Sequence, residues 1–548
     1  MTPFSISTRA TALAKLPEQH FDLIVIGGGI TGVGVLRDAT LRGLKTLLVE
    51  RHDFASGTSS KSSKLVHGGL RYLKQFEFAL TRESCQERNL LVKLNPHLVK
   101  PIPFVFPVYK GDKDGMLALR TGMWLYEVLS GFQNHELHKM LSVHQTLEQI
   151  PGLNPEGLKG SAYYYDAAVD DVRLTLETVK SAVRAGGSAL NYTSVTGFLY
   201  DAQQKVAGVR LEDHLTGQSH EALGTVVLNA TGVWVDEVRT LDAPHRKDLM
   251  PSKGIHVVVP SHRLNQKATL AFTAVQDRRL MFSIPWGDVT LIGTTDTFFD
   301  QSPDDPGTDA VDVSYVLKAA NHIFPGANLT EADIVSTFAG LRPLIAPPEG
   351  VENASAVSRE HQIFEDKSGL LSIAGGKLTT YRRMAIELVD KASTRLSPER
   401  RKELGPCVTD QPLSGEIVDV AALVARLKAE GQPEVVAEHL VSSYGSEAPA
   451  VLELCKSTPN GLAVLQQGQG FLQGEVIYAV RYESALHLTD LLTRRMRFAV
   501  WVPGQGRPVA EQVSRVMAHE LRWDEGTRKE ELHLFDEEVR RSYRPRNG

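Results

Sequence analysis

The stretch Asp22-Leu-Ile-Val-Ile26, followed by Gly27-Gly28-Gly29-Ile30-Thr31-Gly32, decides the fold of this chain. A short β-branched apolar run that stops at glycines is typical of a buried parallel strand. Residues 30–42 contain no proline, and they end at Gly43, which favours a helix. A second strand is predicted over Thr46–Val49. Strand, turn, helix and strand form a βαβ unit, whose right-handed crossover makes the sheet parallel.

The glycines match the G-x-G-x-x-G pattern of a dinucleotide-binding turn. In this pattern Gly27 permits the tight turn, Gly29 lets the backbone approach a pyrophosphate, and Gly32 packs the helix on the strand. Glu50 lies 18 residues after Gly32, where its carboxylate would accept a hydrogen bond from a ribose hydroxyl. An acid at this place disfavours a 2′-phosphate, so FAD or NAD is favoured over NADP. A purely structural turn would have to bring these features together by chance.

Short apolar or alternating runs in the middle of the chain predict a second, partly antiparallel sheet. They cover residues 205–211, 225–230, 254–260, 280–285 and 289–294. Residues 370–374 predict a strand that returns to the first sheet before Gly375-Gly376. From about residue 411 apolar residues recur at helical spacing, as in residues 420–427 and 476–492, which indicates a helical C-terminal domain.

Composition excludes several classes of protein. A chain of 548 residues is too long for one ordinary domain, and 42% hydrophobic with 23% charged residues is typical of a folded globular protein. The net charge of −5 gives no general attraction to nucleic acid. Cys85, Cys407 and Cys455 are scattered and predict free thiols in a reducing compartment, with no metal site. We expect a cytoplasmic protein, since residues 1–20 lack a signal sequence and no apolar run is long enough to span a membrane.

The most specific sequence blocks follow the glycine turn. Residues 58–73, TSSKSSKLVHGGLRYL, are polar and glycine-rich, as suits a segment that wraps a cofactor. With the turn, they resemble the aerobic, FAD-dependent glycerol-3-phosphate dehydrogenases of the D-amino-acid-oxidase-like flavoprotein superfamily. Further matching blocks are VDDVRL (169–174), LNATGVWVD (228–236), KGIHVVVP (253–260), IPWGDVTLIGTTDT (284–297), FAGLRPL (338–344), AGGKLTTYRRMA (374–385) and EVIYAVRYESALHLTDLLTRRMRF (475–498). The resemblance therefore runs from about residue 21 to residue 498.

The resemblance implies an α/β fold in which a Rossmann-like parallel sheet is interleaved with a mixed, partly antiparallel substrate domain. The implied FAD-binding domain is discontinuous and covers residues 21–95, 160–250 and 350–405. The substrate domain covers residues 96–159 and 251–349, and an α-helical C-terminal domain covers residues 410–548.

The implied cofactor is noncovalently bound FAD. His67 is a residue type that anchors flavin covalently in some relatives, but noncovalent binding is expected here. The cofactor-binding residues predicted from the turn and the resemblance are Gly27, Gly29, Ile30, Thr31, Gly32, Glu50, Thr58, Ser59, Ser63, Leu65, His67, Gly68, Val195, Ala230, Gly232, Gly376, Lys377, Leu378 and Thr379.

The substrate that the resemblance implies, glycerol 3-phosphate, is a small phosphorylated alcohol. An acidic protein needs a few directed cations to bind its phosphate. Arg71, Arg342 and Lys377 are predicted to bind the phosphate, with Tyr72 adding a hydroxyl donor. Arg342, Lys377 and His256 are the predicted catalytic residues. On an apolar strand His256 is as readily a buried core group, and Ile255 stands where the family usually has Ser or Thr. The base therefore stays open between His256, a group near Arg342, and water.

The implied reaction is oxidation of sn-glycerol 3-phosphate to dihydroxyacetone phosphate, with hydride transfer from C2 to the flavin and electrons passed to a membrane quinone. Two alternatives are an oxidase that uses oxygen and another FAD-dependent oxidoreductase of hydroxy acids or amines. Expected partners are the substrate and the quinone, without nucleic acid, and a homodimer is compatible with the prediction. Arg494-Arg495-Met496-Arg497-Phe498 is the predicted peripheral contact with the inner face of the membrane, although a helix C-terminal cation cluster explains it equally well.

Overall fold

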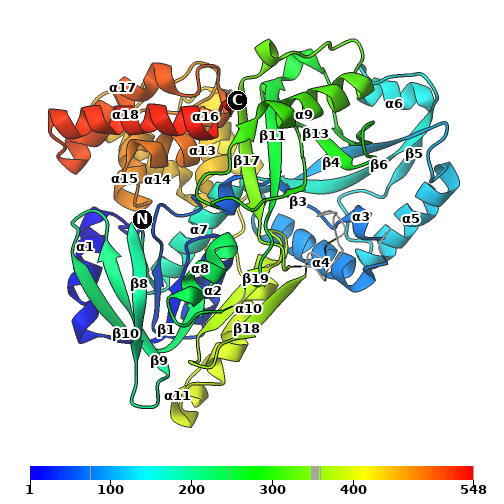
Figure 1. The fold of residues 1–548 in the computed structure, drawn as a ribbon. Helices are drawn as coiled ribbons and strands as arrows, with labels where there is room; N and C mark the ends of the chain where they lie inside the picture. The colour runs from blue at the N-terminus through cyan, green and yellow to red at the C-terminus, as the bar shows by residue number, and fades with distance from the viewer. Residues whose placement is uncertain (74–75, 246, 347–356, 358–359, 547–548) are drawn as a thin grey trace.

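The computed structural model describes residues 1–73, 76–245, 247–346, 357 and 360–546, except for the side chains of Arg71 and Tyr72. Two β-sheets form the body of the molecule, and helices from the C-terminal part of the chain pack against both (Figure 1). The chain crosses from one sheet to the other several times before it enters these helices. The α/β fold with a helical C-terminal region is therefore confirmed.

The first sheet contains the predicted βαβ unit. Its strand order is β18-β19-β10-β1-β2-β7, with β9 and β8 added in antiparallel pairing beside β10. Strand β1 pairs in parallel with β2 and with β10. The strands are β1 (His20–Ile26), β2 (Thr46–Val49), β7 (Ser188–Leu190), β8 (Thr193–Tyr200), β9 (Val206–Asp213), β10 (Ser219–Asn229), β18 (His361–Glu365) and β19 (Leu371–Gly375).

Three helices cover one face of this sheet and fix the glycine turn in place. They are α2 (Ile30–Leu41), α7 (Asp171–Arg184) and α10 (Tyr381–Ser393). Val33, Leu176 and Leu388 from these helices share a buried core with Val25 of β1. Gly34 lets α2 lie against α10, because a Cβ there would be 2.9 Å from the Tyr381 ring. The other face packs under β8 and β9 and helix α1 (Ile6–Ala14).

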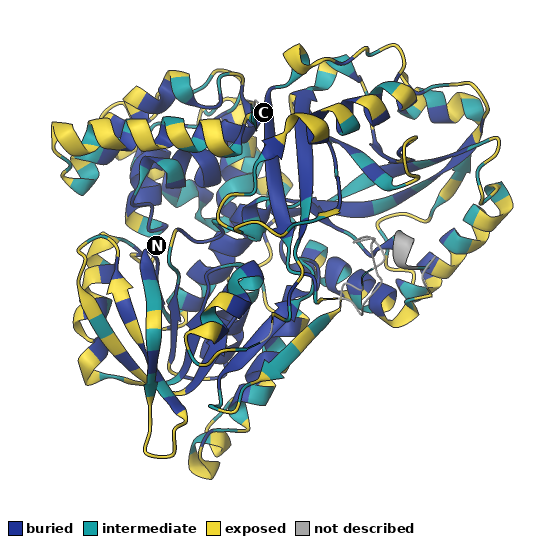
Figure 2. Ribbon diagram, viewed as in Figure 1, coloured by how far each residue is buried: buried dark blue, intermediate teal, exposed yellow. Residues whose placement is uncertain are grey.

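The second sheet has ten strands and mixed pairing. Its order is β15-β11-β14-β13-β12-β4-β6-β3, with β17 beside β11 and β5 beside β6. The strands are β3 (Leu65–Val66), β4 (Val99–Tyr109), β5 (Lys139–Leu141), β6 (Leu158–Val169), β11 (Ser252–Pro260), β12 (Thr269–Thr273), β13 (Leu280–Trp286), β14 (Val289–Gly293), β15 (Thr297–Phe298) and β17 (Ser336–Arg342). Figure 2 shows β11 and β17 deeply buried, so residues at their ends have fixed positions. A partly antiparallel second sheet is thus confirmed for the runs at residues 254–260, 280–285 and 289–294, which form β11, β13 and β14. The prediction is wrong for the runs at 205–211 and 225–230, which form β9 and the end of β10 in the first sheet, because β10 pairs with β1.

The remaining helices lie around the two sheets. Before residue 410 they are α3 (Leu70–Leu73), α4 (Phe78–Leu94), α5 (Met116–Leu129), α6 (Val143–Gln149), α8 (Val235–Thr240), α9 (Ala310–Ile323) and α11 (Pro398–Lys402). After residue 410 they are α12 (Val420–Ala429), α13 (Glu434–Tyr444), α14 (Ala448–Ser457), α15 (Gly474–Tyr482), the π-helical turn η8 (Asp490–Arg495), α16 (Phe498–Trp501), α17 (Arg507–Leu521) and α18 (Glu525–Ser542). A two-stranded sheet joins β16 (Thr308–Asp309) to β20 (Pro545–Arg546).

The arginines at residues 494–497 are buried, so the prediction that they face a membrane is wrong. Arg494, Arg495 and Arg497 are 9%, 4% and 2% exposed. Asp53 accepts hydrogen bonds from Arg494 and Arg495, and Arg497 pairs with Asp170 at 2.7 Å. Their partners come from residues far away in sequence, so these arginines fasten the helical region to both sheets.

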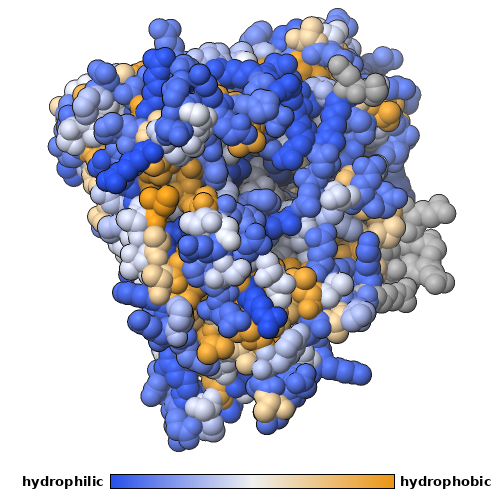
Figure 3. Space-filling model, turned by 60° about the vertical axis from the view of Figure 1, so that its left-hand side comes forward, coloured by the Kyte–Doolittle hydropathy of each residue, from blue (hydrophilic) through white to orange (hydrophobic). Residues whose placement is uncertain are grey.

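No helix within the described residues is long and apolar enough to cross a membrane. The face of the molecule in Figure 3 is largely hydrophilic, with hydrophobic residues in scattered patches. The three cysteines are free thiols, as predicted, and Cys85 and Cys455 are buried.

Candidate functional site

The glycine turn between β1 and α2 is shaped by close backbone contacts. Gly27 has a φ of +109°, and a Cβ there would lie 2.7 Å from the carbonyl oxygen of Ala230. A Cβ at Gly32 would lie only 1.9 Å from the carbonyl oxygen of Gly27. Gly29 is the N-cap residue of α2, and the backbone N–H of Ile30 donates to Ser59 Oγ at 2.9 Å. Ser59 thus lies at the N-terminus of α2, and the preceding glycines add no side chains there, as an approaching pyrophosphate requires.

A cavity of about 350 Å³ lies at this turn. It is bounded by the ends of first-sheet strands that are far apart in the sequence, by residues 56–59 and by Pro343, which follows β17. Thirteen predicted cofactor residues line it, namely Gly27, Gly29, Ile30, Thr31, Glu50, Thr58, Ser59, Val195, Ala230, Gly232, Gly376, Lys377 and Leu378. The glycines and the open helix N-terminus suit the phosphates of a dinucleotide, so the residues fit the predicted group. We call this space the cofactor cavity.

Glu50 stands in the cofactor cavity at the end of β2. Its two carboxylate oxygens accept hydrogen bonds from the backbone N–H groups of Gly28 at 2.6 Å and His52 at 2.8 Å. Burial raises the pKa of the Glu50 carboxyl, while these two hydrogen bonds oppose the rise. The backbone contacts hold the carboxylate in position, and its proposed contact with a ribose hydroxyl remains a prediction.

A smaller cavity of about 230 Å³ adjoins the cofactor cavity. Both are lined by Ile30, Thr58, Ser59, Pro343 and residues 375–378. The smaller cavity adds Ser63, Leu65, His67 and Thr379 from the predicted cofactor residues, and His256 and Arg342 from the predicted catalytic ones. We call it the substrate cavity. The 375–378 turn, which carries Lys377, is the wall that the two cavities share.

Arg342 ends strand β17 at the substrate cavity. Its Nη1 lies 3.2 Å from Asp296 Oδ1, and its Nη2 donates to Thr294 Oγ1 at 2.8 Å. Asp296 also accepts a hydrogen bond from Ser252 Oγ at 2.7 Å. A Cβ at Gly254 would lie 2.4 Å from Arg342 Nη2, so the guanidinium lies flat on the backbone of β11. These contacts fix the direction in which the N–H groups of the Arg342 guanidinium point.

Lys377 and His256 lie on the other walls of the substrate cavity. Lys377 follows Gly375 and Gly376, whose φ angles of +78° and +87° form the turn between β19 and α10. Its Nζ is 3.4 Å from Ser84 Oγ. His256 is 3% exposed, stacks on Phe338 with ring centroids 4.7 Å apart, and places Nε2 2.9 Å from Ser63 Oγ.

Burial, together with the nearby Lys64 and Arg342 cations, lowers the pKa of His256 to about 3. The ring is therefore neutral near pH 7. Its hydrogen-bond partner is Ser63, not the neighbour Ile255 that made a relay doubtful in the sequence. Sequence reasoning missed this pair because the two residues are separated by 193 positions.

Some predicted residues lie elsewhere. Gly32 lies behind the cofactor cavity, against Gly27. Gly68 packs against Cys85 and Tyr126, where a Cβ would lie 2.3 Å from either side chain. The side chains of Arg71 and Tyr72 lie outside the described residues.

Sequence reasoning also missed several cavity residues. Arg51 and Trp234 line the cofactor cavity, and Lys61 and Gly254 line the substrate cavity. Arg51 follows Glu50 directly, and Trp234, Lys61 and Gly254 lie within sequence blocks already singled out, so their place in or beside these motifs was the available signal.

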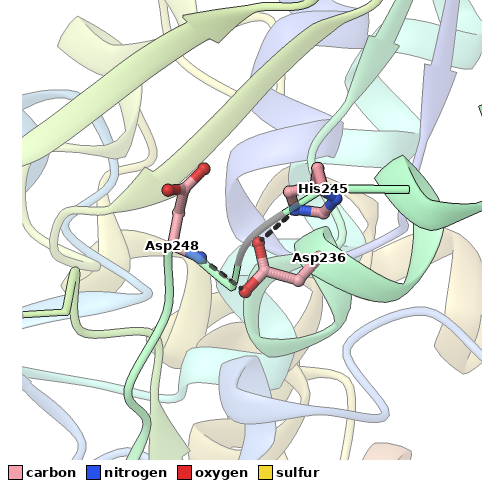
Figure 4. A group of neighbouring side chains, drawn as sticks. All are labelled: Asp236, His245 and Asp248. Carbon is pink, nitrogen blue, oxygen red and sulfur yellow. Dashed lines mark hydrogen bonds and ion pairs between the residues drawn. The ribbon is translucent and has the colours of Figure 1, made fainter. Parts of the chain in front are cut away.

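One group among the described residues has the spacing for a metal ion: Asp236, His245 and Asp248 (Figure 4). Asp236 Oδ1 lies 3.1 Å from His245 Nε2, and its Oδ2 accepts the backbone N–H of Asp248 at 3.1 Å. The guanidinium of Arg239 pairs with Asp248 and with Asp366. A cation thus already balances these carboxylates, and the contacts form an ion-pair network.

Comparisons with known proteins agree with this geometry. Residues 22–382 match the family described as FAD dependent oxidoreductase, and residues 407–528 match the C-terminal domain of alpha-glycerophosphate oxidase. An aerobic glycerol-3-phosphate dehydrogenase of Staphylococcus haemolyticus (strain JCSC1435) is 40% identical over 501 residues, which is 90% of this chain and 89% of that protein. A relative of the same description from Staphylococcus aureus (strain USA300) is 40% identical over 491 residues, 88% of this chain and 87% of its own.

Solved structures show the same fold. The X-ray structure of the glycerol-3-phosphate dehydrogenase from Bacillus halodurans, complexed with FAD, matches with a TM-score of 0.81 and 34% identity, over 98% of both chains. The L-alpha-glycerophosphate oxidase from Mycoplasma pneumoniae, with a TM-score of 0.53 and 17% identity over 68% of this chain and 95% of its own, shares the fold alone. The resemblance seen in the sequence is confirmed: the chain belongs to the FAD dependent oxidoreductases and, among them, to the family of the aerobic glycerol-3-phosphate dehydrogenases.

Proposed function

We propose that this chain oxidises sn-glycerol 3-phosphate to dihydroxyacetone phosphate with bound FAD as the first electron acceptor. The observation that carries the proposal is the placement of Arg342 and Lys377 in a cavity that shares the 375–378 turn with the cofactor cavity. Two cations beside a dinucleotide site suit a small phosphorylated substrate. The 40% identical relatives are glycerol-3-phosphate dehydrogenases, which supports the same substrate.

FAD is the cofactor of the family to which the chain belongs, as the sequence predicted. When bound, FAD supplies the hydride acceptor of the reaction. We propose that the predicted residues lining the cofactor cavity and Ser63, Leu65, His67 and Thr379 of the substrate cavity hold it. The glycines let the phosphates approach the N-terminus of α2, and Glu50 is held beside the cavity for a ribose hydroxyl. Binding is noncovalent in this proposal.

We further propose that Arg342 and Lys377 bind the substrate phosphate and orient the alcohol carbon toward the cofactor cavity. Asp296 and Thr294 hold the Arg342 guanidinium, so little freedom is lost when a phosphate binds. Positive charge near the alcohol also stabilises the negative charge that develops on its oxygen. Arg71 and Tyr72 are proposed as additional phosphate ligands from the resemblance.

His256 is the proposed proton acceptor. With a pKa lowered to about 3 it is neutral at working pH, so a ring nitrogen is available to accept a proton. Ser63 Oγ holds Nε2, and Phe338 supports the ring face, which fixes the imidazole in the wall of the substrate cavity. So weak a base needs the help of the Arg342 and Lys377 cations, which stabilise the alkoxide form of the alcohol.

The proposed domains follow the predicted division, with one change. The first sheet, the second sheet and the C-terminal helices support an FAD-binding domain, a substrate domain and a helical domain. Strand β6 pairs with β4 of the second sheet from Leu158 to Val169. We therefore place the boundary predicted at residue 160 after Val169.

We propose that the electrons pass to a quinone, from a cytoplasmic protein in peripheral contact with the inner face of the membrane, and that the protein forms a homodimer. These points rest on the family resemblance. For the membrane contact, the outer side of α5 replaces the buried arginines: Leu117, Trp124 and Val128 recur at helical spacing and are 78%, 47% and 56% exposed. Aliphatic residues with a tryptophan are the composition of a helix that lies in a membrane interface.

An oxidase that passes electrons to oxygen is the second candidate, since residues 407–528 match the C-terminal domain of an alpha-glycerophosphate oxidase. Hydrogen peroxide released at the rate of substrate turnover, without added quinone, would favour the oxidase.

The central test is an anaerobic titration of the purified flavoprotein with sn-glycerol 3-phosphate. We expect the flavin absorbance to bleach at about one equivalent of substrate, because the two cavities adjoin. Glycerol, which lacks the phosphate, serves as the control and should leave the band unchanged at the same concentration. A flavin band that glycerol 3-phosphate does not bleach would refute the proposed reaction.

A further inference from the structure

Asp304 joins two side chains at the wall of the cofactor cavity. Its Oδ1 accepts a hydrogen bond from Trp234 Nε1 at 2.9 Å and pairs with the guanidinium of Arg51. That guanidinium also lies over the Trp234 ring, 4.6 Å from its centroid. Arg51 and Trp234 line the cofactor cavity beside Glu50. The three side chains therefore form one polar and aromatic unit at this wall.

Arg51 and Trp234 both belong to the wall that the cofactor cavity shares with a second space. A further cavity of about 650 Å³ shares Arg51 and Trp234 with the cofactor cavity and is lined in addition by Asp304 and by Arg541 of helix α18. The pair is thus part of the shared wall between the two cavities, together with residues such as Gly57 and Thr58, and Asp304 contacts it from the side of the larger cavity.

The loop that carries Asp304 is fastened to the C-terminal strand. Arg546 forms a two-pronged ion pair with Asp305, in which Nη1 donates to Oδ2 at 3.0 Å. Strand β16 (Thr308–Asp309) pairs in parallel with β20 (Pro545–Arg546). A Cβ at Gly307 would lie 1.9 Å from Arg546 Nε, so the arginine lies directly on the loop backbone. The position of Asp304 therefore depends on Arg546.

The same C-terminal residues touch the segment that wraps the cofactor cavity. The Nζ of Lys61 lies 3.9 Å from the centre of the Tyr543 ring. The carbonyl oxygen of Tyr543 accepts the backbone N–H of Thr337 at 3.1 Å. The strand β20 that fixes Asp304 is thus itself anchored at its start.

We propose that Asp304 is a cofactor-positioning residue, which Arg546 holds in place so that Arg51 and Trp234 stay fixed at the cavity wall and retain the bound flavin. The proposal rests on the proposed function, which places FAD in this cavity. The carboxylate of Asp304 is 54% exposed and the Arg51 side chain 33% exposed, so salt screens their attraction. Retention of the flavin should therefore weaken as the salt concentration rises.

The test measures the rate of FAD release from the holoprotein, by the rise of free flavin fluorescence after dilution. The variants are Asp304→Asn, Arg546→Ala and their double mutant. Arg540→Ala is the matched control, since Arg540 lies on α18, is 56% exposed and pairs with Asp536 of its own helix. Loss of one exposed ion pair should speed release by about threefold to fivefold in each single variant. The double mutant should release no faster than the single variants, because both act through one contact chain.

A high salt concentration should speed the release of FAD from the wild type. It should change the release rate of the Asp304→Asn variant little. Release at the wild-type rate from Asp304→Asn, or single effects that multiply in the double mutant, would overturn the inference. If Arg546→Ala fails to fold, Asp304→Asn, which preserves side-chain shape, still decides the question through its release rate and salt dependence. A wild-type protein that binds no FAD would refute the proposed function. If the wild type retains FAD and the variants release it at the wild-type rate, only the role of Asp304 is refuted.

Discussion

Asp296 Oδ1 lies 3.2 Å from Arg342 Nη1, and the Asp296 side chain is only 6% exposed. A buried carboxylate thus holds the cation that ends β17 at the substrate cavity. Ser252 donates a hydrogen bond to the same oxygen, so the carboxylate is itself held in place. Arg342 can meet a phosphate without first giving up a flexible conformation.

Asp296→Asn should raise the KM for glycerol 3-phosphate by about fivefold and change kcat much less. The amide keeps the shape of the side chain but removes the charge that orients Arg342, a loss of about 1 kcal/mol for a partly exposed ion pair. The inhibition constant of inorganic phosphate, measured as a competitive inhibitor of the variant, should rise by the same factor. Asp300→Asn, at an exposed aspartate of the same region, is the control. A fall in kcat at constant KM would show that Asp296 does not act through substrate binding.

Gly32→Ala should yield protein without flavin. The new Cβ would lie 1.9 Å from the carbonyl oxygen of Gly27, so the turn at the cofactor cavity must open. Overpacking of this kind costs about 1 to 3 kcal/mol and more where backbone must move. The flavin-to-protein absorbance ratio of the purified variant checks this result.

Gly122→Ala is the matched control for that substitution. Gly122 lies within α5, and, apart from the adjoining backbone of that helix, an added Cβ there meets no atom of the described residues within 4 Å. Alanine in a helix should raise the free energy of unfolding by about 1 kcal/mol and leave flavin content unchanged. Full flavin content in Gly32→Ala would contradict the packing role of Gly32.

The βαβ unit could be predicted because its signals are local. The apolar run, the glycines and Glu50 lie within one short segment, and each reports a backbone requirement that tertiary contacts do not override. Strands β11 and β14 of the second sheet were predictable as short, continuous apolar runs, since both of their faces are buried. The sheet to which a run belongs depends on distant pairing, so the runs that form β9 and β10 were assigned to the wrong sheet.

The partners within the site could not be predicted, because the fold brings them together from distant positions. The Ser63 and His256 pair, and the Arg342 and Asp296 pair, each join separate segments of the chain. The arginines at 494–497 show the same limit: they look like a basic surface in the sequence, but Asp53 and Asp170 neutralise them in the interior.

Arg495→Met should lower the free energy of unfolding by about 3 kcal/mol, because it leaves the fully buried Asp53 carboxylate with fewer partners. Denaturant unfolding of the holoprotein measures the loss. Arg515→Met, at a side chain that is 70% exposed, should cost less than about 1 kcal/mol. Binding to anionic vesicles should be equal in both variants, since Arg495 does not face solvent. Vesicle binding that falls only in Arg495→Met would restore the predicted membrane role of this segment.

His97 should make the protein less stable in acid. It is 1% exposed, and burial lowers its pKa from 6.5 to about 4. Between these values the unfolded chain binds a proton that the folded chain does not, so the stabilising contribution is complete above pH 6.5 and is lost as the pH falls toward 4. The full effect corresponds to about 3 kcal/mol.

His97→Leu should therefore flatten the dependence of the unfolding free energy on pH between about 6.5 and 4, because leucine carries no titrating group. His97 Nδ1 has no hydrogen-bond partner among the described residues, so the substitution removes no hydrogen bond from that atom. His519→Gln, at a side chain that is 89% exposed, is the control and should keep the wild-type slope. Urea unfolding at a series of pH values measures both. An unchanged slope in His97→Leu would mean that other groups, such as the buried His256 with its pKa lowered to about 3, dominate the acid response.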